Sequence, residues 1–458
     1  MSDKTLASFT APTINGLAAQ IIFAATAMEN IYQAEIETGG RGCTQKFSSD
    51  TSGAQIRVIR PLPLPVKARE LGASINGGNF SAYTYQPESQ EYGLNIITVI
   101  DDQVDIPDVR MDMIPVDIAK MYIQNLSDKV VLNINAIKIA ARFYTCFSAF
   151  DADATSAYVE TYTSASDNLL KKIVSTNAKL NKGDSTHGVS VFPMRDRIGL
   201  VSADYYADLL SVSGILSLGG ANYGYDILKK GGLDANSETP DFVDNGFMGV
   251  IVGIPFHCVS DLVLETASEY LGFNENVFSG VVAHISSAHG NLFGLATGNS
   301  INVIPCPNGQ GARLQPKYRM GAACILPKSV AWLVANTWVN PYGLKDLLTA
   351  SSVVFGYKAP GSRPTLAPVV TAVASEKLKV VCDGAEEALY VVSTTAITTV
   401  GGFITAFVAA VAGDKGNILK AAFNTDVQTT AAAADVVYVL CVAADGTLSE
   451  IKSATILD

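Results

Sequence analysis

Charged side chains are scarce in this sequence. Asp, Glu, Lys and Arg make up 16% of its 458 residues, whereas hydrophobic residues make up 48%. A chain with so little charge must bury much of its surface, either within itself or inside an assembly. The net charge of −11 also disfavours nucleic-acid binding through a broad basic surface. At this length we expect two or three domains.

Closely spaced cysteines and long apolar runs are missing as well. The seven cysteines are scattered and include no Cys-x-x-Cys pair, which argues against a zinc knuckle or a disulfide scaffold and favours reduced thiols. The apolar run at residues 17–28 is too short to span a bilayer, and no basic segment with a cleavage site accompanies it. We therefore expect a soluble chain without a membrane segment.

Side chains suited to catalysis are few and dispersed. Of the four histidines, His284 and His289 are five residues apart, and His257 stands next to Cys258, where neighbours on a strand point to opposite faces. The glycine-rich stretch at 219–224 is not followed by the Lys-Ser/Thr pair of a phosphate-binding loop. There is no Gly-x-Ser-x-Gly elbow and no kinase signature. The sequence therefore predicts no enzyme, no catalytic residue and no cofactor.

Aspartates cluster at two places without the pattern of a metal site. Residues 101–112 hold five of them but lack the Asp-x-Asp-x-Asp-Gly rhythm of a calcium loop, and carboxylates just before a helix are explained by the helix dipole. Residues 151–155 begin like a calcium loop, but the required glycine and glutamate do not follow. We predict no metal ion.

The most informative feature that is present is one uninterrupted helical pattern over residues 115–147. Pro115 suits the first position of a helix, and no glycine or proline follows it within this range. Such a helix would be roughly 45–50 Å long. A rod of this length needs a partner surface.

A basic, extended segment precedes this helix. Residues 55–60 alternate as in a strand, the prolines at 61–65 enforce an extended path, and residues 92–100 read as the returning strand. A two-stranded arm is marginal in water by itself, so we expect it to lie across a neighbour. Four cations of this arm are predicted to contact an acidic partner subunit: Arg57, Arg60, Lys67 and Arg69.

The remainder reads as a mixed α/β region followed by a β-rich module. We expect strands at 197–201, 246–256 and 317–326, and helices at 168–180 and from 328 to 336. After a linker at 360–364, the strands expected are 377–382, 388–393, 403–411, 436–442 and 447–456. This last part is predicted to be a separate all-β sandwich that resembles bacterial immunoglobulin-like modules.

The order of these parts resembles the tailed-bacteriophage major capsid proteins of the Hong Kong 97 fold, an α+β class. The most suggestive stretches are 197–206, 246–255 and 318–323, and the resemblance covers about residues 30–360. It implies an N-terminal arm (1–50), an E-loop (51–112), a P domain with a spine helix (113–184), an A domain (185–310), a return to the P domain (311–360) and the added immunoglobulin-like domain (365–458).

The resemblance also implies what the protein does. It implies self-assembly into pentamers and hexamers of an icosahedral shell, which encloses double-stranded DNA without sequence-specific binding. The implied partners are further copies of itself, a separate scaffolding protein, a portal and auxiliary or decoration proteins. The implied location is the virion, after assembly in the host bacterial cytoplasm.

Three other functions remain open from the sequence. An encapsulin-like nanocompartment shares the shell fold but holds cargo protein. An α/β enzyme with a C-terminal carbohydrate-binding domain would require a convergent set of acid–base residues that we do not find. A tail or baseplate protein would contain more β-structure and no helix of this length.

Overall fold

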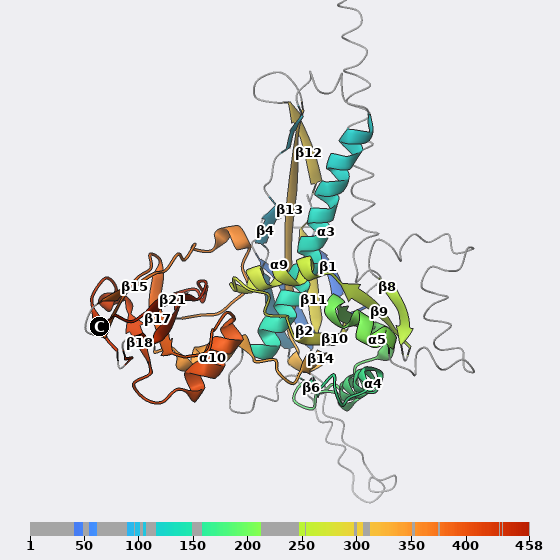
Figure 1. Cartoon of the computed structure of the whole chain (residues 1–458). Coiled ribbons are helices and arrows are strands. Elements are labelled where there is room, and N and C mark those ends of the chain that lie inside the picture. Colours follow the sequence, from blue (N-terminus) through green and yellow to red (C-terminus); the bar gives the residue numbers. More distant parts are fainter. Residues whose placement is uncertain are drawn as a thin grey trace, which may run out of the picture.

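The computed structural model has the α+β class that the sequence predicts (Figure 1). Among the residues that the structure describes, the strands form five sheets, and the longest helix runs through the middle of the molecule. The structure describes residues 41–48, 55–61, 89–95, 97–100, 104–106, 116–148, 158–211, 247–251, 253–296, 300–305, 312–349, 353–373, 376–429, 431–432 and 434–457. Most of the expected N-terminal arm (1–50) lies outside these residues.

The predicted spine helix is confirmed as α3 (Val116–Phe147), about 48 Å long. It packs along β13 (Ala312–Cys324), and the two rise together out of the body (Figure 1). β13 is the central strand of a six-stranded sheet. β12 and β5 pair with its first half, and β11 and β4 pair with its second half. The other strands of this sheet are β1 (Thr44–Ser48), β4 (Ile97–Ile100), β5 (Val104–Ile106), β11 (Asn291–Ala296) and β12 (Ser300–Pro305).

A second six-stranded sheet lies below and beside the helix, in the order β6-β14-β10-β7-β9-β8. Its strands are β6 (Tyr158–Tyr162), β7 (Arg197–Ser202), β8 (Phe247–Ile251), β9 (Ile254–Val259), β10 (Val281–Ser287) and β14 (Val330–Ala335). The helices near it are α4 (Leu169–Lys179), α5 (Tyr206–Ser211) and α9 (Asp261–Leu271).

Two predictions in this region are wrong. The expected helix at 328–336 is instead the buried strand β14, because its valines, alanine and tryptophan fill the centre of the sheet between β6 and β10. The single strand expected at 246–256 is two antiparallel strands, β8 and β9. Gly253 lies in the turn between them with a φ of +77°, a backbone conformation that residues other than glycine rarely adopt.

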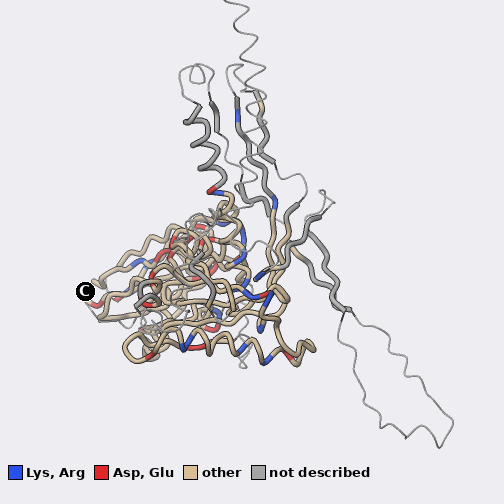
Figure 2. Tube along the Cα trace, turned by 90° about the vertical axis from the view of Figure 1, so that its right-hand side faces the viewer, with Lys and Arg blue, Asp and Glu red and all other residues tan. Residues whose placement is uncertain are grey.

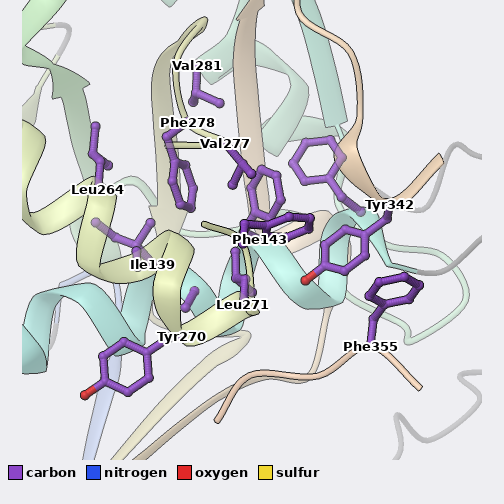
Figure 3. Packing of buried hydrophobic residues seen from close by; sticks show 14 of the residues in the cluster. Ile139, Phe143, Leu264, Tyr270, Leu271, Val277, Phe278, Val281, Tyr342 and Phe355 are labelled. Carbon is purple, nitrogen blue, oxygen red and sulfur yellow. The ribbon is translucent and has the colours of Figure 1, made fainter. Parts of the chain in front are cut away.

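The core sits around the second half of α3. Every residue from 134 to 143 is buried, so this part of the helix is surrounded on all sides. Phe143 lies at its centre, with its ring 4.7 Å from Phe278, 5.7 Å from Trp332 and 6.0 Å from Tyr342 (Figure 3). These partners come from segments far apart in the sequence, and one residue therefore joins them.

The stretch Asp128–Phe147 of α3 is long and apolar enough to cross a membrane, contrary to our expectation from the sequence. In this structure 72% of that window is buried inside the protein. Burial against other protein segments is the environment of a core helix, and it explains the apolar composition.

The C-terminal module, defined here as residues 365–457, contains two sheets. Their strands are β15 (Val369–Val373), β16 (Lys377–Val381) and β19 (Val427–Gln428) in one, and β17 (Ala385–Val392), β18 (Lys415–Leu419), β20 (Val436–Ala443) and β21 (Lys452–Thr455) in the other. A buried apolar cluster that includes Leu378, Tyr390 and Val439 joins the two sheets. The immunoglobulin-like assignment of this module stays a prediction.

The module is not all-β, and the strand predicted at 403–411 is wrong. Residues Val400–Ala409 form the helix α10, whose N-terminus is capped by the Thr399 side chain accepting a hydrogen bond from the Gly402 amide. Its buried side chains are Val400, Phe403, Ile404 and Phe407. These residues are spaced three and four apart, so that they lie on one face of a helix. This helical periodicity outweighs the β-propensity of the individual residues.

Nor is the module separate from the body. The outer face of its four-stranded sheet, with Leu389 and Leu440, belongs to the same apolar cluster as Phe143. The 360–364 segment expected to be a linker contains the short helix η8 (Pro360–Ser362) and holds the two parts together. Apolar side chains on both faces of β17 and β20 require cover on both sides. The three-stranded sheet covers one face and the body covers the other.

The central position of Phe143 leads to a stability prediction. Phe143→Ala should lower the free energy of unfolding by about 3–5 kcal/mol, because it removes a fully buried ring and leaves a cavity. Chemical denaturation of the purified chain measures this. Val408→Ala is the control, since that side chain on α10 is 63% exposed and its loss should cost less than about 0.5 kcal/mol. Equal effects of the two changes would contradict the central role of Phe143.

Candidate assembly site

The arm predicted from the sequence begins as a two-stranded ribbon. β2 (Gln55–Pro61) and β3 (Ser89–Asn95) pair in antiparallel register from Gln55↔Asn95 to Pro61↔Ser89, and form a sheet of their own. β3 also contacts β13, and Leu94 is fully buried, which anchors the base of the ribbon. Its far end leads into residues 62–88, which lie outside the described residues.

The structure places two of the four predicted contact residues. Arg57 pairs with Gly93 and Arg60 with Gln90 in the ribbon, so both stand on the part of the arm beyond its buried base. Lys67 and Arg69 lie outside the described residues. The backbone thus brings the first two arginines onto one ribbon, and their role as inter-subunit contacts stays a prediction.

One arginine fastens the C-terminal module to the body. The Arg363 guanidinium donates hydrogen bonds to the backbone oxygens of Tyr270, at the end of α9, and Gly356, and a 3.2 Å bond to Thr447 Oγ1 in the module. Burial lowers the pKa of Arg363. Gly272, with φ +86°, leaves room for this side chain, since a Cβ there would lie 2.2 Å from Arg363 Nη1.

Two carboxylates strengthen the same junction. Glu275, in the body, accepts a hydrogen bond from the Val400 amide at the N-terminus of α10, and burial raises the pKa of Glu275. Glu387, fully buried on β17, accepts bonds from the Thr349 amide (3.1 Å), the Thr349 hydroxyl (2.7 Å) and Asn417 Nδ2 (2.9 Å). The half-buried Glu275 and the buried Glu387 thus each tie module and body together.

A cleft of about 920 Å³ opens where the module meets the body. One wall is formed by residues 275–279 and 337–341 of the body, and the other by the loop 393–399 and one face of α10. The loop consists mainly of serine and threonine. Three carboxylates line the cleft, Glu275, Asp414 and Asp435, and none of its lining residues is Lys or Arg.

The histidines and cysteines considered for chemistry have structural surroundings. His257 and Cys258 are neighbours on β9, and burial raises the pKa of the Cys258 thiol, which disfavours the reactive thiolate. His187 Nδ1 lies 2.7 Å from Asp184 Oδ2, an ion-pairing partner that Lys328 shares. Among the described residues, no group of three or more His, Cys, Asp and Glu side chains is placed to hold a metal ion.

The sequence did not identify Arg363 or Glu275 as important residues. Arg363 stands within a Pro- and Gly-containing stretch that is typical of a linker, which hid its role. One signal was available, because no arginine follows it in the chain. Glu275 carries no such signal, since its partner is a backbone amide 125 residues away.

Comparison with solved structures finds phage capsids. The chain is similar to the capsid of Ralstonia phage GP4 with 10% identity and a TM-score of 0.43, covering 64% of this chain and 86% of that one. The chain is also similar to the bacteriophage PhiM1 mature capsid, with 11% identity and a TM-score of 0.40, covering 66% of this chain and 87% of that one. The similarity to the capsid of Staphylococcus phage Andhra has 12% identity and a TM-score of 0.38, covering 66% of this chain and 84% of that one.

All three similarities have TM-scores of 0.43 or lower. At 10–12% identity they concern the course of the chain rather than its side chains. No family model and no curated protein matches this chain.

The buried His284 makes stability depend on pH. Its ring stacks on Trp332 at 4.6 Å, and burial, with the nearby Arg142 charge, holds the pKa of His284 well below its usual range. Between that lowered pKa and about 6.5, the unfolded chain binds the proton and the folded chain does not. Stability should therefore fall as the pH drops below about 6.5. In His284→Phe this decline should be shallower when unfolding is followed at several pH values, and an unchanged slope would contradict the assignment.

Removal of the Arg363 side chain should loosen the module. Arg363→Ala loses three hydrogen bonds from a charged donor and should cost about 3 kcal/mol. Limited proteolysis should then cut between residues 349 and 365 faster than in the unchanged chain, and the thermal midpoint should fall. Arg195→Ala, whose side chain is 85% exposed, is the matched control and should change neither. Unchanged protection of Arg363→Ala would show that the shared apolar core alone holds the module.

Proposed function

We propose that this chain is the major capsid protein of a tailed bacteriophage, a structural and non-enzymatic subunit. It assembles into pentamers and hexamers of an icosahedral shell around double-stranded DNA. The regions at 51–112, 113–184, 185–310 and 311–360 serve as E-loop, P domain, A domain and return to the P domain. A separate scaffolding protein, a portal and decoration proteins are the partners, and assembly takes place in the host cytoplasm.

The observation that carries the proposal is the β2–β3 ribbon. It is a two-stranded sheet anchored only at its base among the described residues, and such a ribbon is marginal in water unless another surface covers it. A neighbouring subunit provides that surface in a closed shell. Ring symmetry repeats the contact at every subunit, so that many weak contacts add up.

The elongated helix and sheet support the same function. α3 and β13 extend beyond the body as a blade, which offers a long edge to neighbours rather than a pocket to a small molecule (Figure 1). The low charge content of the chain fits repeated burial of its surface. Assembly would then be driven by apolar area removed from water, at about 25 cal/mol per Å².

The nanocompartment alternative predicts the same particles with different contents. Purified particles that contain double-stranded DNA after infection support the capsid function, whereas particles filled with one host-type enzyme would favour the compartment.

The test combines electron microscopy with reversal of the arm charges. The purified chain, alone and with its neighbouring genes, should give polyhedral shells or rings of five and six subunits. Arg57→Glu with Arg60→Glu should leave a folded subunit whose shell yield falls about tenfold, because like charges then meet across the interface. Arg195→Glu with Lys452→Glu is the control, since it removes the same charge from exposed sites outside the arm.

Two results would contradict the proposal. A monomer or dimer under both expression conditions would argue against a shell subunit. Normal shells from the arm variant would argue against the arm as an inter-subunit contact while leaving the shell itself in place.

A further inference from the structure

Two buried thiols meet inside the body, at the C-terminal ends of α3 and β13. Cys146 stands in the last turn of α3, and Cys324 is the last residue of β13. Their side chains are hydrogen-bonded to each other. Cys146 Sγ also lies 3.6 Å from the backbone oxygen of Pro327. Cys324 Sγ lies 3.4 Å from the backbone oxygen of the adjacent residue, Leu326. Two free sulfurs from elements far apart in the sequence are therefore in contact.

Hydrogen-bond donors converge on Cys324. Asn291 Nδ2 donates to Ser329 Oγ at 3.1 Å, and the Ser329 hydroxyl in turn donates to Cys324. Charged positions are sparse along the described part of the trace (Figure 2), yet one of them, Arg142, is buried close enough to act on this thiol. Donors and a nearby positive charge stabilise a thiolate relative to a thiol. The surroundings of Cys324 are therefore those of a nucleophilic cysteine.

The two thiols differ in how easily they lose a proton. The hydrogen bond from Cys146 lowers the pKa of Cys324. Arg142 and Ser329 contribute to the same shift, and together these interactions outweigh the opposing effect of burial. Burial raises the pKa of Cys146 well above its usual range. Cys324 is therefore the first of the two to become a thiolate, while Cys146 stays a neutral thiol beside it. This is the arrangement of an attacking cysteine next to a resolving one.

From this geometry we infer that Cys324 and Cys146 form a redox pair that a peroxide closes into a disulfide. The Cys324 thiolate attacks one oxygen of hydrogen peroxide, the O–O bond breaks, and a sulfenic acid forms on Cys324. The departing hydroxide takes up the proton that Cys324 released and becomes water. Cys146 Sγ then attacks the sulfenic sulfur, the S–S bond forms, and the S–O bond breaks as the oxygen leaves with the Cys146 proton as a second water. Two thiols and one peroxide thus give one disulfide and two waters.

The burial of the pair selects the oxidant. Cys146 is 4% and Cys324 6% exposed, so a small uncharged peroxide reaches them through brief openings of the core more readily than a molecule as large as oxidised glutathione. The new bond joins the spine helix covalently to the central strand of its sheet. The reaction does not depend on the proposed function, but its timing does. In a shell subunit the thiols stay reduced during assembly in the cytoplasm, and the bond forms after the particle has left it.

Peptide mapping of the oxidised chain tests the pair. The purified, unchanged chain is treated with hydrogen peroxide, alkylated under denaturing conditions and digested without reductant. Two peptides linked through Cys146 and Cys324 should appear, and reductant should abolish the link. Oxidised glutathione at the same concentration should give about tenfold less of the linked peptides. Oxidation should also raise the thermal midpoint by about 3 °C, because the bond restricts the unfolded chain.

Single replacements separate the two roles. In Cys146→Ala the sulfenic acid has no resolving thiol, so the sulfenic-acid probe dimedone should label Cys324. In Cys324→Ala the same probe should leave Cys146 unlabelled. Ser329→Ala removes a donor to the thiolate and should slow disulfide formation in the otherwise unchanged chain about tenfold. Ser268→Ala is the control, because this buried serine of α9 donates to a backbone oxygen of its own helix, and the rate should stay within about twofold.

Three results would overturn the inference. If both thiols stay free for alkylation at peroxide concentrations that oxidise Cys258, the pair is not reactive. If Cys324 is oxidised to the sulfinic acid without a link, or if either thiol links to a different cysteine, the two sulfurs are not partners. If dimedone labels Cys146 in Cys324→Ala as strongly as it labels Cys324 in Cys146→Ala, the assigned roles are wrong. All of these measurements use the purified chain whether or not it forms shells, so failure of the redox pair and failure of the proposed function are distinguishable.

Discussion

Complete burial of residues 134–143 of α3 is the constraint on which the rest of the structure depends. A helix stretch that is buried on every side has no face to leave in water, so partners must come from all directions, including partners for the buried Lys138 and Arg142. Ile139 and Phe143 are enclosed by α9, by the segment that carries Phe278 and by Tyr342 (Figure 3). The two large sheets and the C-terminal module are thereby fixed to one rod. The free end of the same rod extends out of the body together with β13.

Much of this organisation could be predicted from the sequence, because it depends on long and regular patterns. The absence of glycine and proline over 32 residues predicted α3 correctly, and the alternation at 55–60 predicted β2. Errors arose where a short apolar segment fits either element. The sequence pattern predicts a helix where β14 lies and a strand where α10 lies, and in both cases the neighbours that cover the segment decide which element forms.

The junction between module and body could not be predicted for a related reason. Its contacts join residues far apart in the chain, as between Arg363 and Tyr270 or between Glu275 and Val400. No local pattern encodes such a pair. The composition change near residue 365 did indicate a new unit, but composition cannot tell whether a unit swings freely or shares a core with its neighbour. Arg57 and Arg60, by contrast, could be assigned to the arm because a strand and its turn residues are local features.

The shared core at residues 353–363 has a mechanical consequence. The ring centroid of Phe355 lies 5.3 Å from that of Tyr342 on one side. On the other side the ring packs closely against Gly446 of the module, where an added Cβ would lie only 2.7 Å from the Phe355 ring. A module joined to the body by a flexible linker alone would transmit no force to it. This one is continuous with the spine helix through closely packed rings, so a load applied to the module passes directly to α3. The module therefore cannot shift relative to α3 without separating these packed rings.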